Sequence, residues 1–433
     1  MRDTARSGRI LFALALLALA LASSTYAACP NRLPYAVTPE GFCPFVWAQG
    51  LNSPRGMARA ANNDLLVVEQ DSQQVTVLWD DNGNGVSDKN ERALLAKADG
   101  LNHAVLIHGL YLYASSASTV YRWPYRAGVR QNLGTPEVVV NSIPTCCDHV
   151  TRAIVFDAKG RFYVQLGSGS NVDPNSDHAR IHRFNITSIP KGGFNWSAGE
   201  IFADGLRNEV GLRFDKQGRL WGVENGIDNV FRADLGGDVH ANNPSEELNL
   251  FFPELPGLFY GYPYCWSQYN LTTGKPPGTQ WATDKFMKDG THTDAWCQNP
   301  HNVQKPRLNL QAHYAPLDIF FYDRALTPPP IANQTNSSRL PADLNGDAFI
   351  SAHGSWNRNP PVGYRVLHVF FDKNGMPIKY EPFLAYQGPG DTGDNWPHRP
   401  VGLDIGRCVA FGECLYVSSD ASGVIIAVGY ESS

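Results

Sequence analysis

The sequence predicts an all-β fold, a six-bladed β-propeller with a long capping insertion between blades four and five. One pattern recurs at intervals of about 40 to 50 residues: an apolar strand, a turn with Gly, Asn or Asp, and one or two further apolar strands. Helical periodicity is nearly absent beyond the N-terminal apolar segment. The alternative is a β-sandwich or several small β-domains, because strand periodicity is weak in any one segment.

The repeats follow one another along the chain, and each predicts one blade. They are residues 54–79, 102–125, 150–170, 209–235, 346–375 and 400–428. Residues 315–323, which include APLDIFFYD, supply an additional strand to the fifth repeat. An aromatic- and Pro-rich segment at about residues 236–313 separates repeats four and five. Loops of this length in a compact fold are usually functional, so we expect an ordered cap over one face.

The N-terminus has the features of a secretory signal. Basic residues precede the apolar run from Ile10 to Ala22, and the small-residue sequence SSTYAA follows it. The run is too short and too early for a stable membrane span, so we expect cleavage after Ala27. Residues 28–433 then form a single propeller domain that is secreted and has no membrane span.

Charge excludes two classes of partner. The net charge is −5, with 36 Lys and Arg against 41 Asp and Glu, and both signs are interspersed. There is no basic stripe for nucleic acid and no polybasic membrane tether. Asn-X-Ser/Thr sequons favour a glycoprotein; they begin at Asn185, Asn195, Asn270, Asn333 and Asn336.

The eight cysteines indicate disulfides in an oxidising compartment. Spacing favours three local closures: Cys29 with Cys43, Cys265 with Cys297, and Cys408 with Cys414. Cys146 and Cys147 then remain; they pair with each other, pair elsewhere or stay reduced.

Residues 80–91, DDNGNGVSDKNE, fit the twelve-residue calcium-loop pattern. The predicted ligands are Asp80, Asn82, Asn84, the carbonyl of Val86, Asp88 and Glu91. Calcium here would be structural, because we expect the loop on a connection between blades. The alternative is an Asn- and Gly-rich turn without metal.

Unusual polar residues recur near the strand starts of successive repeats. They are Arg55, Asn102, His103, Asp148, His149, Arg207, Asn208, His353, His398 and Arg399. Each alone is more simply a salt-bridged arginine or a satisfied polar side chain. A propeller gathers such positions at one end of its channel, and converging guanidinium groups imply a buried polyanion.

Three stretches resemble one family. GLRNEVGLRFDKQGRLWGVENGIDN, CCDHVTRAIVFDAKGRFYVQLGSGS and FISAHGSWNRNPPVGYRV look like the secreted pyrroloquinoline-quinone (PQQ)-dependent pyranose and sorbosone dehydrogenases. The soluble quinoprotein glucose dehydrogenases are more distantly similar. The resemblance covers nearly all of the chain after the signal. It implies a PQQ- and Ca²⁺-dependent enzyme that oxidises the C1 hydroxyl of a pyranose or osone by hydride transfer to the quinone.

The resemblance also assigns roles. His149 would be the general base, and Asp148 would orient its imidazole. Arg207 would stabilise charge near the quinone oxygens, and Asn208 would hydrogen-bond the cofactor. Further cofactor contacts are expected from Asn102 and, as anchors for the cofactor carboxylates, from Arg55 and Arg399.

A second Ca²⁺ is expected beneath the cofactor, where it would act as a Lewis acid. Its ligands would include backbone carbonyls around Gly226 and Ile227, and Asp228 could add a carboxylate. The glucose enzymes have proline where Ile227 stands. They also offer a lysine on the fifth blade, whereas this chain offers His353 or Arg358, which favours the pyranose and sorbosone branch.

By the same resemblance, a Cys146–Cys147 bridge would pack on the quinone. We expect a monomer that passes electrons to an external acceptor, such as a cytochrome or a copper-dependent polysaccharide oxygenase. Aromatic residues could stack on the sugar or simply pack in the fold; these are Tyr260, Tyr262, Trp266 and Trp356. The rival functions are a calcium-dependent propeller lactonase or hydrolase and a non-enzymatic binding propeller.

Overall fold

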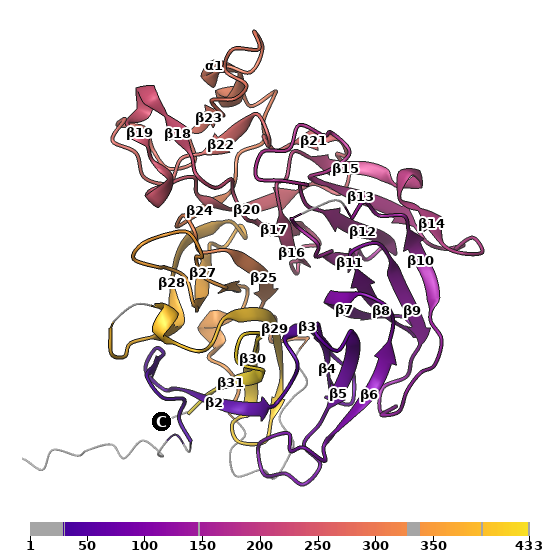
Figure 1. Ribbon diagram of the computed structural model, residues 1–433. Coiled ribbons are helices and arrows are strands. Elements are labelled where there is room, and N and C mark those ends of the chain that lie inside the picture. Colours follow the sequence, from indigo (N-terminus) through magenta and orange to yellow (C-terminus); the bar gives the residue numbers. More distant parts are fainter. Residues whose placement is uncertain (1–28, 30, 146–147, 327–337, 391–392, 432–433) are drawn as a thin grey trace, which may run out of the picture.

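Six β-sheets surround a central axis in the computed structural model, which describes residues 29, 31–145, 148–326, 338–390 and 393–431 (Figure 1). The predicted six-bladed propeller is confirmed. The predicted signal segment, Cys146, Cys147 and the sequons at Asn333 and Asn336 lie outside the described residues. The other three sequon asparagines are exposed, and their glycosylation stays a prediction.

Each blade is antiparallel, apart from a parallel edge strand in blades two and three, and its first strand lies innermost, where it contacts the first strands of both neighbouring blades. Blade one consists of β3 (Pro54–Arg59), β4 (Leu65–Glu69), β5 (Gln74–Leu78) and β6 (Arg92–Lys97). Blade two consists of β7 (Leu101–His108), β8 (Tyr111–Ser116), β9 (Val120–Pro124), β10 (Glu137–Asn141) and the parallel edge strand β14 (Phe194–Asn195). Blade three consists of β11 (Ile154–Phe156), β12 (Arg161–Leu166), β13 (Arg180–Asn185), β15 (Glu200–Asp204) and the parallel edge strand β21 (Leu258–Phe259).

The remaining blades complete the ring. Blade four consists of β16 (Glu209–Phe214), β17 (Leu220–Glu224), β20 (Glu246–Phe251) and β24 (Leu308–Leu310). Blade five consists of β25 (Pro316–Phe321), β26 (Ala348–Ala352), β27 (Arg365–Phe371), β28 (Pro377–Tyr386) and β1 (Ala36–Val37). Blade six consists of β29 (Pro400–Cys408), β30 (Gly412–Ser419), β31 (Val424–Tyr430) and β2 (Phe42–Gln49).

Strands from near the N-terminus close the ring. β2 pairs antiparallel with β31, with Phe42 opposite Tyr430, so blade six combines the two ends of the described chain. β1 likewise adds an edge to blade five. A strand inside a blade packs against the neighbouring blade on each side, so both of its faces are buried. This explains the continuous apolar run LLVV in β4. Glycines make the tight turns: Gly160 (φ 77°) and Gly218 (φ 74°) close the turns that follow β11 and β16.

The position of the predicted insertion needs correction. Blade four takes β20 and β24 from inside residues 236–313, so two excursions interrupt this blade instead of one insertion following it. β20 pairs with β17 along its length, and this pairing draws the chain back to the sheet between the excursions. The two excursions form a cap that projects from the propeller beside blade four (Figure 1).

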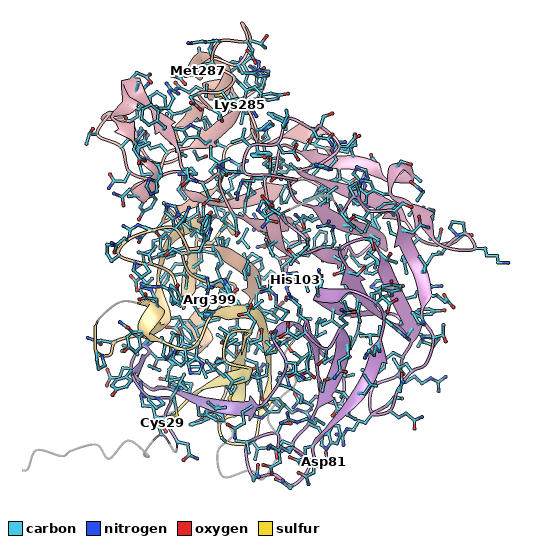
Figure 2. The ribbon with its side chains drawn as sticks, viewed as in Figure 1. Cys29, Asp81, His103, Lys285, Met287 and Arg399 are labelled. Atoms are coloured by element: carbon cyan, nitrogen blue, oxygen red, sulfur yellow. A yellow bond between two sulfur atoms is a disulfide. The ribbon has the colours of Figure 1, made fainter. Side chains whose placement is uncertain are left out.

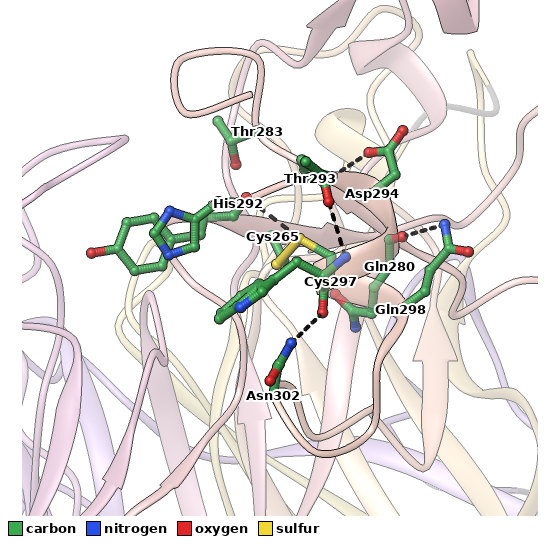
Figure 3. Close-up of a disulfide and its surroundings, with 12 residues drawn as sticks. Cys265, Gln280, Thr283, His292, Thr293, Asp294, Cys297, Gln298 and Asn302 are labelled. Carbon is green, nitrogen blue, oxygen red and sulfur yellow. Dashed lines mark hydrogen bonds between the residues drawn. A yellow bond between two sulfur atoms is a disulfide. The ribbon is translucent and has the colours of Figure 1, made fainter. Parts of the chain in front are cut away.

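The cap contains two small hairpins and a short helix. Its elements are β18 (Phe231–Arg232), β19 (Gly237–Asp238), β22 (Cys265–Ser267), β23 (Gln280–Ala282), α1 (Asp294–Gln298), and the 3₁₀ turns η2 (Ala233–Leu235) and η3 (His240–Asn242). Figure 3 shows the Cys265–Cys297 disulfide that joins β22 to α1. Arg232 is almost fully buried and pairs with Asp234 and Asp294, so the cap has an ordered core of its own.

All three local disulfide predictions are confirmed: Cys29–Cys43, Cys265–Cys297 and Cys408–Cys414. Helical structure in the described residues is limited to α1 and short turns, which besides those of the cap are η1 (Trp196–Ala198), η4 (Ala342–Leu344) and η5 (Gly393–Asn395). No helix in this part of the chain has the length and apolarity to span a membrane.

The predicted calcium loop connects β5 and β6 inside blade one; its expected place between blades was wrong. Figure 2 shows Asp81, within this loop, at the outer edge of the propeller. Glu91 accepts hydrogen bonds from the backbone N–H groups of Asp81, Asn82 and Asp88, and Asp80 accepts from those of Gly83 and Gly85. No group of three or more Asp, Glu, His or Cys in the described residues is arranged to hold a metal. The loop would also use two asparagines and a backbone carbonyl, which such a group of acidic, His and Cys side chains does not include. Calcium binding here therefore stays a prediction.

Candidate active site

A cavity of about 240 Å³ lies at the end of the propeller where the inner strands begin. Many of the predicted site residues converge there: His149, Arg207, Asn208, Gly226, Asp228, His353 and Arg399. The cavity also includes residues that sequence reasoning missed, namely Asn225, Glu246, His313, Ala315, Leu317, Gly354, Ser355 and Asn357, and it includes Trp356.

Ser168 fixes the imidazole of His149. Nδ1 of His149 lies 3.0 Å from both the carbonyl oxygen and the hydroxyl of Ser168. A carbonyl can only accept, so Nδ1 carries the proton and Nε2 remains an acceptor. The orienting role expected for Asp148 therefore falls to Ser168, and Asp148 itself is exposed.

Burial, followed by the positive charge of Arg207, lowers the pKa of His149 to about 3. The imidazole is therefore neutral near neutral pH and able to accept a proton. An anionic ligand beside Arg207 would offset that charge and raise the pKa of His149 towards the value that suits a general base.

Two neighbours hold the His149 segment in place. Arg152 is fully buried and donates from Nη1 to the carbonyl of His149 (2.7 Å) and from Nη2 to that of Pro144 (2.8 Å). Gly167 leaves room on the other side, because a Cβ there would lie 2.6 Å from Cβ of His149 and 2.8 Å from Oδ1 of Asn208. The close approach of His149 and Asn208 thus requires glycine at this position.

Arg207 belongs to a connected polar network. Its Nη2 lies 2.8 Å from Oδ2 of Asp228 and 3.1 Å from Oδ1 of Asn171. Oδ1 of Asp228 in turn accepts from Nδ2 of Asn357 at 3.0 Å. These contacts hold the Arg207 guanidinium at the cavity wall and occupy both oxygens of Asp228.

Glu246 adds a buried carboxyl to the cavity. It accepts from the backbone N–H groups of Gly226 (2.7 Å) and Ala315 (3.1 Å). Burial raises its pKa to about 7 despite these hydrogen bonds. The sequence did not predict a role for Glu246, because the segment SEELNLF resembles the start of any ordinary strand.

Asp420 links two residues, one of which lines the cavity. Its carboxylate lies 2.6 Å from Nη1 of Arg55 and 2.9 Å from Nε2 of His353. Burial opposes ionisation, but His353 and Arg55 outweigh it and lower the pKa of Asp420. His353 reaches the cavity, whereas Arg55 lies behind it and is not part of the lining.

Arg399 is the cation available to a ligand. Its Nε and Nη2 donate to the carbonyls of His353 (3.1 Å) and Gly354 (2.7 Å). Among the described residues, no carboxylate lies within ion-pair distance of it, and Arg55 is close enough to interact unfavourably with it. With Asp420 shared by Arg55 and His353, this wall carries excess positive charge.

Several predicted residues lie elsewhere. Asn102 donates to the carbonyl of Val150, and His398 contacts the Ser422 hydroxyl. Arg358 bonds to the carbonyl of Ala241 in the cap, so the fifth blade offers the cavity His353 and not Arg358. Ile227 is buried and packs with the cap core.

An apolar layer closes the floor of the cavity. Val210, Leu317 and Val401 pack together from three inner strands. A second cavity of about 320 Å³ continues along the channel below and includes His103, which therefore does not line the first. Figure 2 shows His103 near the propeller axis. The layer separates the polar site from the rest of the channel.

The donor set suits a ligand that carries carboxylates. Arg399 and Arg207 supply guanidinium groups, and Asn208 supplies an amide. The buried Oδ1 of Asn357 has no hydrogen-bond partner among the described residues, so it can accept from a ligand hydroxyl. His149 places a neutral base in the same cavity, and such a base can accept the proton that leaves a hydroxyl group when an alcohol is oxidised.

Comparison with known proteins gives a consistent result. The TrAA12-like family matches residues 36–431. A pyrroloquinoline quinone-dependent pyranose dehydrogenase of Coprinopsis cinerea is 32% identical over 94% of this chain and 56% of its own length. A pyrroloquinoline quinone-dependent sugar dehydrogenase of Hypocrea jecorina is 30% identical over 91% of this chain and 89% of its own length.

A solved structure agrees with these relatives. The holo form of the PQQ domain of the Coprinopsis cinerea pyranose dehydrogenase has a TM-score of 0.76 and 29% identity, and covers 93% of this chain and 99% of that domain. The chain spans about half the length of the Coprinopsis cinerea relative, 56% of it.

Proposed function

The chain belongs to the TrAA12-like family, and from this membership we propose that it is a PQQ- and calcium-dependent sugar dehydrogenase. The substrate would be a pyranose or osone oxidised at its C1 hydroxyl, and the electrons would pass to an external acceptor. The observation that carries this proposal is the cavity itself: Arg399, which pairs with no carboxylate among the described residues, faces the same space as the neutral base His149. The names of the relatives support the cofactor class.

Oxidation of a sugar hydroxyl removes a proton from oxygen and a hydride from carbon. Bound PQQ would supply the acceptor for the hydride and its two electrons. Nε2 of His149 would take the proton, since Ser168 holds Nδ1 in its protonated form. Arg207, held by Asp228 and Asn171, would stabilise developing negative charge.

Cofactor binding would rest on the cations and amides of the cavity. Arg399 would pair with a carboxylate, and Asn208 would donate a hydrogen bond. Arg55 would act indirectly, through Asp420 and His353. Because Asp228 is already engaged, we assign Ca²⁺ to the backbone carbonyls of Gly226 and Ile227.

The disulfides support a proposal for where the protein acts. The three of them favour an oxidising compartment, and we therefore propose that the protein is secreted. A separate cytochrome or copper-dependent oxygenase remains our proposal for the electron acceptor.

Reconstitution tests the function. Purified protein is loaded with PQQ and Ca²⁺ and assayed for dye reduction with a panel of aldoses and osones, beside a sample given Ca²⁺ alone. We expect turnover only in the loaded sample and a loss of about 10² to 10⁴-fold in His149→Ala. Failure to bind PQQ at micromolar concentration, or lactone hydrolysis with Ca²⁺ alone, would overturn the proposal in favour of its rivals.

A further inference from the structure

The segment 354–363 between β26 and β27 forms one side of the cavity mouth. It is braced from within: the Ser355 N–H donates to the Val362 carbonyl (2.9 Å), and the Val362 N–H donates to the Ser355 hydroxyl (3.0 Å). The Tyr364 hydroxyl donates to the Ser355 carbonyl, and Arg358 ties the segment to the cap. The side chains it carries are therefore presented in a defined position.

Trp356 on this segment has no packing role that explains it. Its side chain is 76% exposed although it borders the cavity, whereas Tyr260, Tyr262 and Trp266 are each only 4% exposed. Of the ten tryptophans, all in the described residues, only Trp356 is mostly exposed. An indole left in water on a braced segment forgoes the gain of burial, so its position points to a ligand.

Asn357 beside it presents an unsatisfied acceptor. Oδ1 of Asp228 can only accept, so it fixes the amide with Nδ2 towards Asp228 and leaves Oδ1 on the other side. That Oδ1 is buried without a partner among the described residues. A ligand that donates a hydroxyl would satisfy it.

We propose that Trp356 and Asn357 form the sugar subsite of the cavity, an inference that rests on the proposed function. A pyranose ring has an apolar C–H face and a rim of hydroxyl groups. The indole would cover the face, and Oδ1 of Asn357 would accept from one hydroxyl. The same amide is linked through Asp228 to Arg207. A sugar bound to Asn357 would therefore be held in a fixed position relative to the reacting groups. An acyclic polyol lacks the flat face and would bind less tightly.

Tryptophan fluorescence tests the subsite without turnover. Acrylamide quenching is measured on the apoprotein and on the PQQ-loaded protein, with a hexopyranose or with sorbitol at equal concentration. We expect the pyranose to protect the exposed emission component at least about threefold better than sorbitol. Trp356→Ala should lack that component. Phe231→Ala, which removes an exposed aromatic residue of the cap outside the cavity lining, should behave like the unchanged protein.

Steady-state kinetics provide the second readout. Trp356→Ala should raise KM for the pyranose about tenfold with kcat within twofold, and Trp356→Phe should stay within about threefold of the unchanged KM. One monodeoxy sugar should lose about tenfold in kcat/KM with the unchanged protein but not with Asn357→Ala.

The outcomes separate this inference from the proposed function. No protection by pyranose in either form, or an unchanged KM in Trp356→Ala, overturns the subsite even when PQQ supports turnover. If PQQ does not bind, the dehydrogenase proposal fails, and protection of Trp356 in the apoprotein still decides whether the cavity takes a sugar.

Discussion

Asp420 is the most informative residue to change, because its carboxylate contacts both the Arg55 guanidinium and the His353 imidazole in a largely buried network. Asp420→Asn keeps the shape of the side chain and removes its charge. The Arg55 side chain is 9% exposed and that of Asp420 16%, so Arg55 would be left as a largely buried, unpaired charge close to Arg399. Removing one member of such a pair costs about 3–5 kcal/mol. We expect the free energy of unfolding in urea at neutral pH to fall by about that amount.

Two further variants make this measurement specific. Glu137→Gln breaks the Arg122–Glu137 pair, whose acid is 55% exposed, and should cost less than about 1 kcal/mol. Replacing Asp420 by Leu together with Arg55 by Met removes both charges and should recover most of the stability, because apolar groups of similar size replace the buried pair. The reasoning is refuted if Asp420→Asn costs no more than Glu137→Gln, or if the double variant is the least stable of the set.

Three other changes probe the site and its surroundings. Gly167→Ala places a methyl group 2.6 Å from Cβ of His149, so dye reduction by the loaded protein should fall at least about tenfold while the circular dichroism spectrum is unchanged; equal rates would contradict the close approach. Leu317→Ala opens the apolar floor and should lower the free energy of unfolding by about 2–5 kcal/mol in urea titrations. Burial raises the pKa of Glu247 from 4.5 to about 7, so its contribution to stability is complete below pH 4.5 and is lost as pH rises through about 7. Glu247→Gln should therefore reduce the fall in melting temperature between these pH values, and an unchanged fall would count against the burial of this acid.

Much of the fold follows from local patterns. The inner strands were predictable because apolar runs and turn residues are signals within one repeat, and the three disulfides were predictable because their cysteines lie close together in the sequence. The outer strands of blade four were not, since β20 and β24 are separated by the excursions that build the cap. β24 is only three residues long and becomes a strand through its pairing with β20.

The candidate site shows the same division. His149, Arg207 and Arg399 were predictable because each stands shortly before an inner strand, and the propeller brings such positions together. Asp420 and Glu246 gave no signal, because a single acid in a turn or strand acquires its role only from residues on other blades. Arg358 was misplaced because its direction depends on the braced segment and on the cap, neither of which sequence periodicity records.

The most direct test of the account is an equilibrium titration of the apoprotein with PQQ in the presence of Ca²⁺. We predict saturable binding with a Kd of about 1 µM or below, weakened about 10 to 100-fold in Arg399→Gln and unchanged in Arg358→Gln, which contacts the cap and not the cavity. Absence of saturable binding, or equal weakening in the two variants, would contradict the claim that this cavity holds the cofactor.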